Sequence, residues 1–356
     1  MPGPTREPDD AAVRASSRAT LAERAQAPAE LPELPDPLAW RSLVPADVDA
    51  LTALIGHIEA TDNPPYRTTT DEVRDYFDPG QDYAGIGGFD GEGKLRAFGF
   101  VRLRHGEAQV RRVFLSGGIE ASLRDRGVGR AILDWQLARA RQILASSEYA
   151  QESDVTALIV VDVDDDTGAL AHLLASRGFA PRRYYSQLRR DLTVPIPELT
   201  VDRPLYVEPW TPSIDDAVRR AHNTAFNDVW GSEPLTPQEW QRERSHNVPS
   251  WSFVALDRSS DRAQVAGYLM SGRYEHDWPA LGWTEGYTEI LGVLPAWRGR
   301  HVAGALLTHA MRAYAADGMQ YAGLDVDADN PTGAIGVFGR LDYEQVRSSA
   351  VYMLEI

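Results

Sequence analysis

The sequence predicts two successive α/β (or α+β) domains, each built from a sheet with helices around it. The chain has 356 residues, which is enough for two domains at roughly 100–200 residues per domain. Short apolar or alternating segments, typical of strands, are interspersed with segments of helical periodicity. The same order of elements also occurs twice along the chain.

Two pairs of matching segments define this repeat. Residues 118–133 contain Arg-Asp-Arg-Gly-Val-Gly-Arg and correspond to residues 292–307, which contain Arg-Gly-Arg-His-Val-Ala-Gly. Arg124 and Arg298 therefore lie 174 residues apart. Residues 162–169 correspond in the same way to residues 327–334. Because two landmarks recur in the same order, we interpret the chain as a duplication.

A proline-rich segment over residues 193–204 marks the boundary between the copies, since proline lacks the N–H group that a helix or a central strand needs. The first domain is therefore expected over residues 39–195 and the second over residues 203–356. Residues 1–38 are rich in Pro, Ala, Arg, Asp and Glu and contain no aromatic residue. We expect them to form a flexible tail, with a short amphipathic helix within residues 11–25 as the only order.

Each copy is expected to contain the same elements in the same order. In the first copy a helix begins near Pro45, strands are expected over residues 83–89, 95–103, 110–119 and 157–163, and a second helix over 129–144. In the second copy the expected strands are 251–256, 265–272, 287–293 and 322–326, with a helix over 302–315. A loop that contains glycine joins the third of these strands to the helix in both copies.

Composition argues against several kinds of site and partner. With 36 Lys and Arg against 52 Asp and Glu, the net charge is −16. Such a chain repels nucleic acids and anionic membranes at long range and attracts amine-bearing ligands. The absence of cysteine excludes disulfides, thiolate catalysis and Cys-ligated zinc. No apolar stretch approaches the ~20 residues of a membrane helix, and no apolar block of a signal peptide is visible, so we expect a cytoplasmic protein.

The loop between strand and helix has the residues of an anion-binding site. Gly127 and Gly129 would let a phosphate approach the backbone, and the first turn of the next helix offers free N–H groups with a partial positive charge. Arg124, Arg126 and Arg130 add positive charge. A tight turn with solvated arginines is the alternative. The sequence contains neither a P-loop nor the third glycine of the dinucleotide fingerprint.

These loops, together with an Asn-x-x-x-Ala helix and a Gly-Phe-like strand entry further on, resemble the GNAT superfamily of acyl-CoA-dependent N-acetyltransferases. The resemblance covers both halves and implies two tandem GNAT-like domains, each a mixed, mostly antiparallel, twisted sheet flanked by helices. It implies acetyl-CoA as co-substrate, no metal, and direct transfer of the acetyl group to the amine of a small molecule. It also implies that a bulged strand binds the pantetheine arm, which agrees with Gly118 and Gly292, since a strand glycine often marks a bulge or a close backbone approach.

The resemblance assigns coenzyme binding to both copies. In the second copy the residues are Leu291, Gly292, Val293, Arg298, Gly299, Arg300, His301, Val302, Ala303, Gly304, Asn330 and Phe338. In the first copy they are Ile119, Arg124, Gly127, Gly129 and Arg130. Two departures from the family pattern stand out: His301 replaces the usual glycine, and the position of the family's frequent tyrosine acid is Phe338 in the second copy and Leu173 in the first.

The second copy is expected to perform the chemistry. Acetyl transfer to an amine needs a base, and the period of two along a strand places Glu285, Tyr287 and Glu289 on one face of the strand that leads into the loop. A buried carboxylate with a raised pKa suits a base. The two glutamates are equally compatible with polar positions on a half-exposed strand. The aligned positions in the first copy are Arg111, Val113 and Leu115. That copy is therefore interpreted as degenerate, with a loop that is still compatible with coenzyme binding.

Other interpretations stay open at this stage. The missing tyrosine is compatible with a non-catalytic acyl-CoA-binding or sensor protein, and the Arg-Gly loops with a nucleotide-binding regulator; Tyr287 or Tyr352 could replace the missing acid. The acidic run at residues 162–166 lacks the spacing and the glutamate of a Ca²⁺ loop. The segment with His222, Phe226, Trp230 and Trp240 either shapes the acceptor pocket or belongs to the core. A small-molecule amine is the expected partner, and the sequence leaves a homodimer open.

Overall fold

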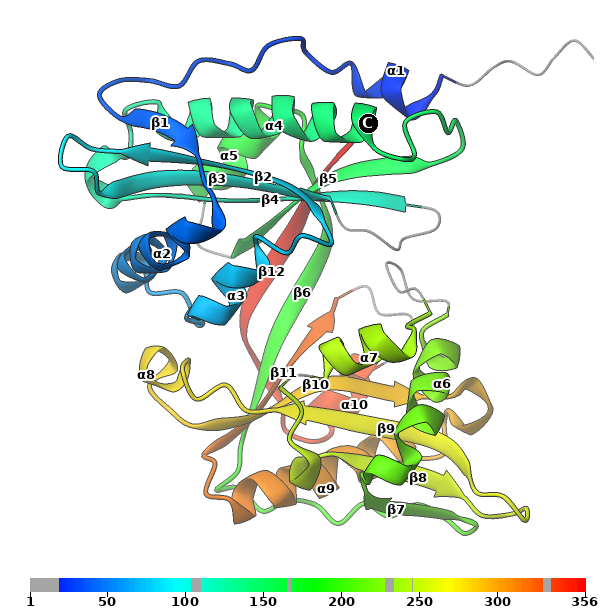
Figure 1. The fold of residues 1–356 in the computed structure, drawn as a ribbon. Helices are drawn as coiled ribbons and strands as arrows, with labels where there is room; N and C mark the ends of the chain where they lie inside the picture. The colour runs from blue at the N-terminus through cyan, green and yellow to red at the C-terminus, as the bar shows by residue number, and fades with distance from the viewer. Residues whose placement is uncertain (1–18, 104–109, 165–167, 228–233, 245, 329–333) are drawn as a thin grey trace, which may run out of the picture. The chain divides into compact units, whose positions relative to one another are not determined.

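The computed structural model describes residues 19–103, 110–164, 168–227, 234–244, 246–328 and 334–356 (Figure 1). These residues form two compact units, each a sheet flanked by helices. Of the described residues, the first unit contains those from residue 19 to Ile58, those within Thr70–Val161, and Met353–Ile356. The second contains Glu59–Thr69 and Asp162–Tyr352.

The first unit has a sheet in the order β1-β2-β3-β4-β5. Its strands are β1 (Ala39–Ser42), β2 (Asp82–Phe89), β3 (Leu95–Leu103), β4 (Val110–Ile119) and β5 (Thr156–Asp164). Its helices are α1 (Leu21–Ala25), α2 (Val48–Asp62), α3 (Thr70–Asp75) and α4 (Val128–Ser146). Strands β1 to β4 pair antiparallel, whereas β4 and β5 pair parallel. One apolar cluster joins Ile132 of α4 to Ala97, and another joins Leu51 of α2 and Val73 of α3 to Phe100.

The second unit has a sheet in the order β12-β6-β11-β10-β9-β8-β7. Its strands are β6 (Ala180–Asp191), β7 (Leu205–Pro209), β8 (Phe253–Asp257), β9 (Gln264–Gly272), β10 (Glu285–Val293), β11 (Tyr321–Asp327) and β12 (Glu344–Glu355). Its helices are α5 (Gly168–Ala175), α6 (Asp215–Ala225), α7 (Pro237–Glu243), α8 (Trp278–Leu281), α9 (Val302–Ala316) and α10 (Ala334–Gly339). Pairing is antiparallel from β7 to β10 and between β11 and β6, and parallel between β10 and β11.

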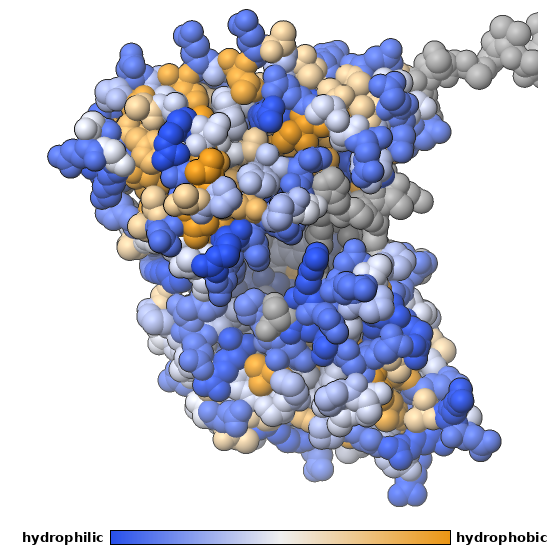
Figure 2. Space-filling model, in the orientation of Figure 1, coloured by the Kyte–Doolittle hydropathy of each residue, from blue (hydrophilic) through white to orange (hydrophobic). Residues whose placement is uncertain are grey.

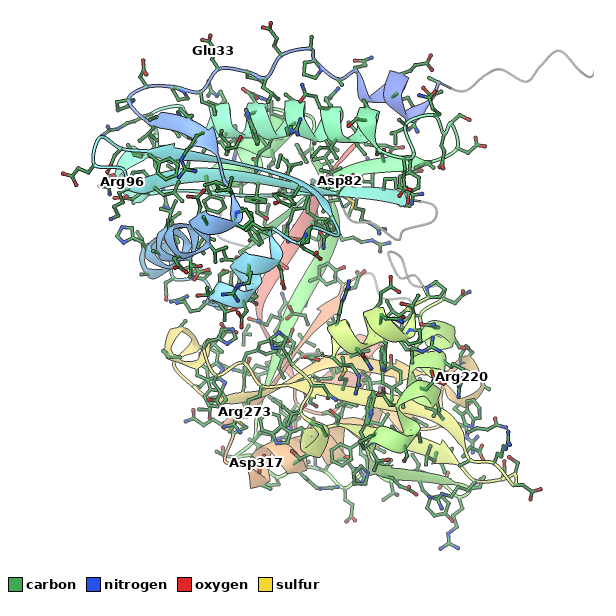
Figure 3. The ribbon with its side chains drawn as sticks, viewed as in Figure 1. Glu33, Asp82, Arg96, Arg220, Arg273 and Asp317 are labelled. Carbon is green, nitrogen blue, oxygen red and sulfur yellow. The ribbon has the colours of Figure 1, made fainter. Side chains whose placement is uncertain are left out.

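Helices cover both faces of this second sheet (Figure 1). On one face, Leu306 and Met311 of α9 pack in an apolar cluster with Leu324 of β11. On the other face, Val218 of α6 and Trp240 of α7 form a cluster with residues of β8 and β9. The end of α9 is fixed by Asp317, labelled in Figure 3, which accepts a hydrogen bond from the indole of Trp251 at 2.5 Å. Leu291 and Val293 of β10 pack against the first cluster and Ile290 packs against the second, so β10 lies between two separate cores.

Residues 19–38 differ from the flexible tail expected for residues 1–38. Leu21 and Ala25 of α1 are fully buried, and the Leu21 N–H donates to the carbonyl of Glu152 at 2.8 Å. The Arg24 guanidinium donates to the carbonyls of Val155 and Ile356. The α1 helix is thus part of the core of the first unit, because its apolar residues and Arg24 fill positions beside α4 and β5. Residues 1–18 lie outside the described residues.

The two units also differ from the expected division at residues 195 and 203. Strand β6 precedes the proline-rich linker, yet it pairs with β11 from Asp191–Tyr321 to Tyr185–Asp327. Conversely, Met353–Ile356 belong to the first unit, where the Ile356 N–H donates to the carbonyl of Ala157 at 3.0 Å. Each copy therefore gives its last strand, in whole or in part, to the other unit. The segment Glu59–Thr69 is likewise part of the second unit.

The visible surface of both units is mainly hydrophilic (Figure 2), as the net charge of −16 leads one to expect. The exposed large apolar residues include Val44 and Tyr66. Among the described residues, no helix combines the length and apolar character that crossing a bilayer requires.

Candidate active site

Strands β10 and β11 separate part-way along their length. Their parallel pairing covers Glu285–Thr288 of β10 and stops there, although β10 continues to Val293 and β11 to Asp327. On its other side β10 stays paired with β9 as far as Val293. The backbone groups of residues 290–293 that point away from β9 therefore face the opening between the two strands, where a ligand could bind them.

A β-bulge interrupts β10 where this opening begins. Thr288 pairs with Ser271 of β9, and Ile290 pairs with the adjacent Met270, so that Glu289 is the additional residue. The bulge is at Glu289 and not at Gly292. A Cβ atom on Gly292 would lie only 2.5 Å from the ring of Tyr268, so this glycine allows close packing rather than a bulge.

The first unit has the opening but not the bulge. Parallel pairing of β4 with β5 covers Val110–Phe114, and β4 then continues to Ile119. The structure describes every residue of β4 from Val113 to Ile119, and the pairing of these residues with β3 is uninterrupted. Gly118, like Gly292, marks a close approach, because its Cβ would lie 2.7 Å from the side chain of Ile58.

The additional residue in β10 changes which positions of the two copies are equivalent. In the part of β10 before the bulge, each residue is equivalent to the residue of β4 that lies 173 positions earlier in the chain. In the loop the corresponding difference is 174 positions. The equivalents of Glu285 and Tyr287 are therefore Arg112 and Phe114, and Ser116 lies beside the position of the bulge. The positions aligned from the sequence, which are Arg111, Val113 and Leu115, belong to the opposite face of β4. Neither set contains a carboxylate.

Two side chains hold the start of the loop after β10. The indole Nε1 of Trp297 donates to Oδ2 of Asp257 at 2.8 Å. The Nε of Arg298 donates to the carbonyl of Val293 at 3.1 Å, and its Nη2 donates to the carbonyl of Ala225 at 3.3 Å. Arg298 therefore stabilises the loop through backbone carbonyls. The sequence motif alone does not distinguish this structural role from ligand binding.

Two residues with left-handed backbone then turn the chain into α9. Gly299 has φ 74° and His301, the N-cap of α9, has φ 59°. For a residue with a side chain this conformation costs about 1–2 kcal/mol, which glycine avoids. His301 is exposed. It occupies the family's glycine position with the glycine-like conformation retained.

The first turn of α9 fits a diphosphate. The N–H groups of Val302, Ala303 and Gly304 precede the first helical hydrogen bond, which Ala305 donates to the carbonyl of the N-cap residue at 3.0 Å. They coincide with the positive end of the helix dipole. A Cβ on Gly299 would meet no atom within 4 Å, so the approach to the loop is open.

The side chains around this turn divide into two groups. Arg300 is exposed and lies in the electrostatic field of Asp257. Leu291 and Val293 pack against the α9 core, so these two residues of β10 offer a ligand their backbone. Gly304 allows close contact with the linker, because its Cβ would lie 2.9 Å from the side chain of Leu199.

The loop of the first unit is built in the same way. Arg124 Nε donates to the carbonyl of Ile119 at 3.3 Å, as Arg298 does in the second unit. Asp125 (φ 59°) and Gly127 (φ 83°) take the two left-handed positions. A Cβ on Gly129 would lie 3.0 Å from Ile119, and Arg130 is exposed. The duplicated sequence motif therefore corresponds to a duplicated loop conformation.

The bulge residue Glu289 lies beside two tyrosines. Its Oε1 accepts a hydrogen bond from the hydroxyl of Tyr274 at 2.7 Å. The ring of Tyr274 contacts the ring of Tyr287 edge-on, with centroids 5.8 Å apart. Burial, followed by the nearby Asp325, raises the pKa of Tyr287 well above its usual value. The structure thus places Glu289 and Tyr287 on one face, opposite the face that α9 covers.

Two more carboxylates lie on this face. Burial raises the pKa of Glu285, while a hydrogen bond from Trp283 Nε1 at 2.9 Å acts in the opposite direction. Part of the Asp325 side chain reaches water, yet loss of hydration raises its pKa, and the Tyr287 hydroxyl donates to it. Asp325 and Tyr274 are not among the residues predicted from the sequence. Asp325 had a visible signal, since it lies on the apolar strand that runs beside β10.

The segment Glu59–Thr69 lies near these carboxylates, which no sequence pattern indicated. The Arg67 N–H donates to Oδ1 of Asp277 at 2.6 Å, and Asp277 is close enough to Glu285 to raise the pKa of that carboxyl. The Tyr66 hydroxyl donates to Asp164 at 3.2 Å. Residues that precede β2 in the chain therefore form part of the surroundings of the site.

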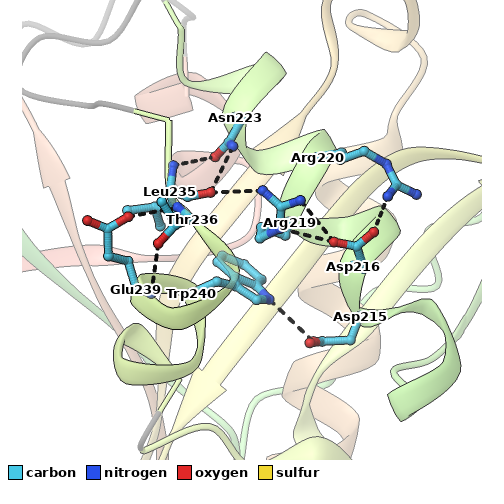
Figure 4. A network of polar contacts seen from close by, with 9 residues as sticks. All are labelled: Asp215, Asp216, Arg219, Arg220, Asn223, Leu235, Thr236, Glu239 and Trp240. Carbon is cyan, nitrogen blue, oxygen red and sulfur yellow. Dashed lines mark hydrogen bonds and ion pairs between the residues drawn. The ribbon is translucent and has the colours of Figure 1, made fainter.

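A polar network fixes α6 and α7 against each other (Figure 4). The Asn223 side chain accepts from the N–H of Leu235 at 2.9 Å and donates to its carbonyl at 3.1 Å. Arg219 donates to the same carbonyl at 2.9 Å. The Trp240 indole donates to Asp215 at 3.3 Å. This network holds Trp240, whose ring is buried, in the core rather than in a pocket.

His222 also belongs to this core. It is 6% exposed, its Nδ1 contacts the Tyr268 hydroxyl at 2.6 Å, and its ring stacks on Phe226 with centroids 4.7 Å apart. Burial lowers the pKa of His222 to about 4. Of the segment considered as a pocket wall, His222, Phe226 and Trp240 are thus packed together, and Trp230 lies outside the described residues.

The low pKa of His222 predicts a loss of stability in mild acid. The unfolded chain binds a proton near pH 6.5, whereas the folded chain does so only near pH 4. Between these values the unfolded state binds more protons, so the free energy of unfolding should fall by about 3 kcal/mol as the pH decreases. Urea unfolding at several pH values measures this. His222→Gln should remove that part of the slope, whereas His172→Gln, at an exposed position, should keep it; equal slopes in the wild type and His222→Gln would contradict the prediction.

The remaining predicted positions lie elsewhere. The ring of Phe338 is buried in the α9 core with its centroid 5.8 Å from that of Tyr343, so it is not on the surface of the opening. Asn330 lies outside the described residues. Within the described part of the chain, no group of three or more His, Asp or Glu side chains is arranged to hold a metal ion.

Sequence comparison relates this arrangement to known proteins. Residues 216–343 match the acetyltransferase (GNAT) family. Over 201 residues the chain is 27% identical to the mycothiol acetyltransferase of Streptomyces coelicolor, which corresponds to 52% of this chain and 58% of that relative. The match therefore spans little more than half the length of that curated protein.

Solved structures match along most of the chain. A GCN5-related N-acetyltransferase from Sphaerobacter thermophilus has a TM-score of 0.67 at 21% identity, over 91% of this chain and 97% of that one. A tandem GNAT protein from the clavulanic acid biosynthesis pathway has a TM-score of 0.61 at 16% identity, over 90% and 98% of the two chains. At these identities the likeness shows the fold, which is that of two successive GNAT domains.

Proposed function

We propose that the chain, whose residues 216–343 match the acetyltransferase (GNAT) family and which has a tandem GNAT fold, transfers an acetyl group from acetyl-CoA to the amine of a small molecule. One observation carries this proposal. A single strand, β10, has both the bulge residue Glu289 and, four residues further on, the entry to the anion-binding loop and α9. One element therefore positions a carboxylate and the loop that we propose to bind coenzyme.

The residues for coenzyme binding follow from the loop. Acetyl-CoA supplies the acetyl group as a thioester. We assign its diphosphate to the N–H groups of Val302, Ala303 and Gly304, with Arg300 as an additional cation. The backbone of Leu291–Val293, which faces the opening beside β11, is assigned to the pantetheine arm. The first unit has the same loop without the carboxylates of the second, and we propose that it binds coenzyme without catalysing transfer.

Glu289 is the proposed base. A base must lie within hydrogen-bond reach of the ammonium whose proton it takes, and Glu289 is at the point where β10 leaves β11. Glu285 lies four residues away, about 13 Å along the strand, in the part of β10 that is still paired with β11. We therefore assign proton removal to Glu289 and acceptor binding to Glu285, while the protonated Tyr287 is available as a donor.

We propose that the acceptor is cationic. The face of the sheet that carries Glu289 also carries Glu285 and Asp325, and Asp277 lies close to Glu285. Burial is the main cause of the raised pKa of Glu285, which means that water solvates this carboxylate poorly. An ammonium group would compensate for the missing hydration.

Release of coenzyme A over a panel of amines tests the proposal. Because the chain contains no cysteine, a thiol reagent detects released coenzyme without background from the protein. Each diamine is compared with the amino alcohol of the same length. We expect turnover with the diamines and a kcat/KM about tenfold above that of the amino alcohols, which corresponds to about 1.4 kcal/mol. Coenzyme binding without release for any amine would instead favour the acyl-CoA sensor, which the buried Phe338 at the usual acid position also permits.

A further inference from the structure

A chain of buried hydroxyl groups lies beneath the bulge of β10. The Tyr314 hydroxyl of α9 is 2.6 Å from Oγ of Ser271 on β9 and 3.1 Å from Oγ1 of Thr288 on β10. The Ser271 hydroxyl also donates to the carbonyl of Trp251 at 2.8 Å. Tyr314 and Ser271 are fully buried and Thr288 is 4% exposed. These residues link α9, β9, β10 and the short 3-10 helix Pro249–Trp251 on the α9 side of the sheet.

The direction of each hydrogen bond in this chain can be deduced. A carbonyl only accepts, so the single proton of Ser271 is committed to Trp251. Ser271 Oγ must then accept from Tyr314, and Tyr314 Oη must accept from Thr288. Burial raises the pKa of Tyr314 to about 12, so its proton remains in place for this role. All three hydrogen bonds therefore donate in the same direction, from Thr288 toward the carbonyl of Trp251.

The hydroxyl chain begins where the geometry of β10 changes. Thr288 is the last residue of β10 paired with β11, and the bulge follows immediately at Glu289. Ser271 is the residue of β9 directly opposite Thr288. A Cβ on Gly286 would lie 2.3 Å from the Tyr314 ring, so this glycine makes room for the ring under the strand.

The first unit provides an internal comparison. From the two sets of strand registers and the 174-residue offset of the helices, the equivalents of Ser271, Thr288 and Tyr314 are Val101, Leu115 and Ala140. All three are apolar and buried. The pairing of β4 with β3 is uninterrupted there. The copy without the hydroxyl groups is thus the copy without the bulge.

We propose that Tyr314 is a positioning residue, whose hydroxyl holds the bulge and thereby keeps Glu289 on the acceptor side of the sheet. The inference rests on the proposed function. A shift of one residue in a strand turns every side chain before it to the opposite face. Without the bulge, Glu285, Tyr287 and Glu289 would point into the apolar core around α9. The bulge is what lets one strand present carboxylates on one side and Leu291 and Val293 on the other.

Tyr314→Phe tests this inference, because it removes the hydroxyl and keeps the ring. The Thr288 hydroxyl then loses its acceptor, and a buried unsatisfied group destabilises the local structure. We expect kcat to fall by about 100-fold, as for a misplaced catalytic group, while the KM for acetyl-CoA changes by less than about threefold because the loop is intact. Amide hydrogen exchange of residues 286–292 should become at least about tenfold faster, since local opening needs less free energy.

Two further variants make the test decisive. Tyr343→Phe removes another buried tyrosine hydroxyl, one without a hydrogen-bond partner among the described residues, and should leave kcat and exchange unchanged. The double variant Tyr314→Phe with Thr288→Val also removes the Thr288 hydroxyl, which would otherwise lack a hydrogen-bond acceptor. It should recover thermal stability but not kcat. Wild-type kcat and wild-type exchange in Tyr314→Phe would overturn the inference. Absence of turnover in the wild type would instead refute the proposed function, and hydrogen exchange would still report on the bulge.

Discussion

Glu289→Gln is expected to lower kcat by about 10²–10⁴-fold, the usual contribution of a positioned general base. Gln keeps the size of the side chain and can still accept the hydrogen bond from Tyr274, but it cannot take a proton from the ammonium. Coenzyme affinity should remain within about twofold, because the anion-binding loop is not altered. Titration calorimetry with coenzyme A and steady-state kinetics measure the two quantities separately.

The pH dependence and two further variants sharpen this result. In Glu289→Gln the residual rate should rise with pH until the free amine predominates, since solvent must then remove the proton. Glu285→Gln should raise the KM for the amine more than it lowers kcat. Glu285 lies in the paired part of β10, and we assign it to acceptor binding rather than to proton removal. Glu344→Gln, an exposed carboxylate on β12, controls for the change in net charge. A kcat for Glu289→Gln equal to that of Glu344→Gln would rule out Glu289 as the base.

Leu21→Ala is expected to lower the free energy of unfolding of the first unit by about 2–5 kcal/mol. Leu21 is fully buried, and its N–H bonds to the carbonyl of Glu152, so the truncated side chain leaves a cavity that a fixed backbone cannot easily close. Urea denaturation followed by tryptophan fluorescence and circular dichroism measures the change. Because the chain has two compact units, the transition should separate into two steps, with only the step of the first unit shifted.

Leu31→Ala in the same N-terminal segment is the matched control. Leu31 is 37% exposed, and a surface substitution of this kind changes stability by about 0.5 kcal/mol or less. Equal effects of Leu21→Ala and Leu31→Ala would show that α1 does not contribute to the core of the first unit.

The order of the N-terminal segment could not be predicted from its amino-acid composition alone. Its abundance of Pro and charged residues indicates disorder, and the burial of Leu21 and Ala25 is not visible in such a composition. A local signal was nevertheless present, because Thr20 and Glu23 form a capping box of the kind that marks the start of a helix. Arg24 could not be recognised, since its carbonyl partners come from residues more than 100 positions away.

The loops could be predicted because their physical requirements are local. Glycine at a left-handed position, a free first turn of a helix and a preceding strand all appear within about ten residues of sequence, and both copies show them. The face shared by Tyr287 and Glu289 followed from the period of a strand. The equivalence between the copies did not, because one additional residue at Glu289 shifts the register by one and has no local signature.

The remaining parts of the site depend on distant segments. Asp325 and Tyr274 reach the site through the neighbouring strand and the chain after β9, and Glu59–Thr69 joins it through Arg67 and Asp277. Which strands become neighbours is decided by the packing of the whole chain. A repeat in the sequence identifies two similar sets of elements, but it does not say which strand pairs with which.

The exchanged strands determine how the protein can be divided. A fragment that ends in the linker would carry β6 without β11, and the complementary fragment would expose the edge of β11 and carry the last residues of β12 without β5. Uncovered strand edges promote aggregation. Halves produced separately should therefore be insoluble alone and recover structure only by complementation. For the same reason, removal of either half from the intact chain should leave the other half without part of its sheet.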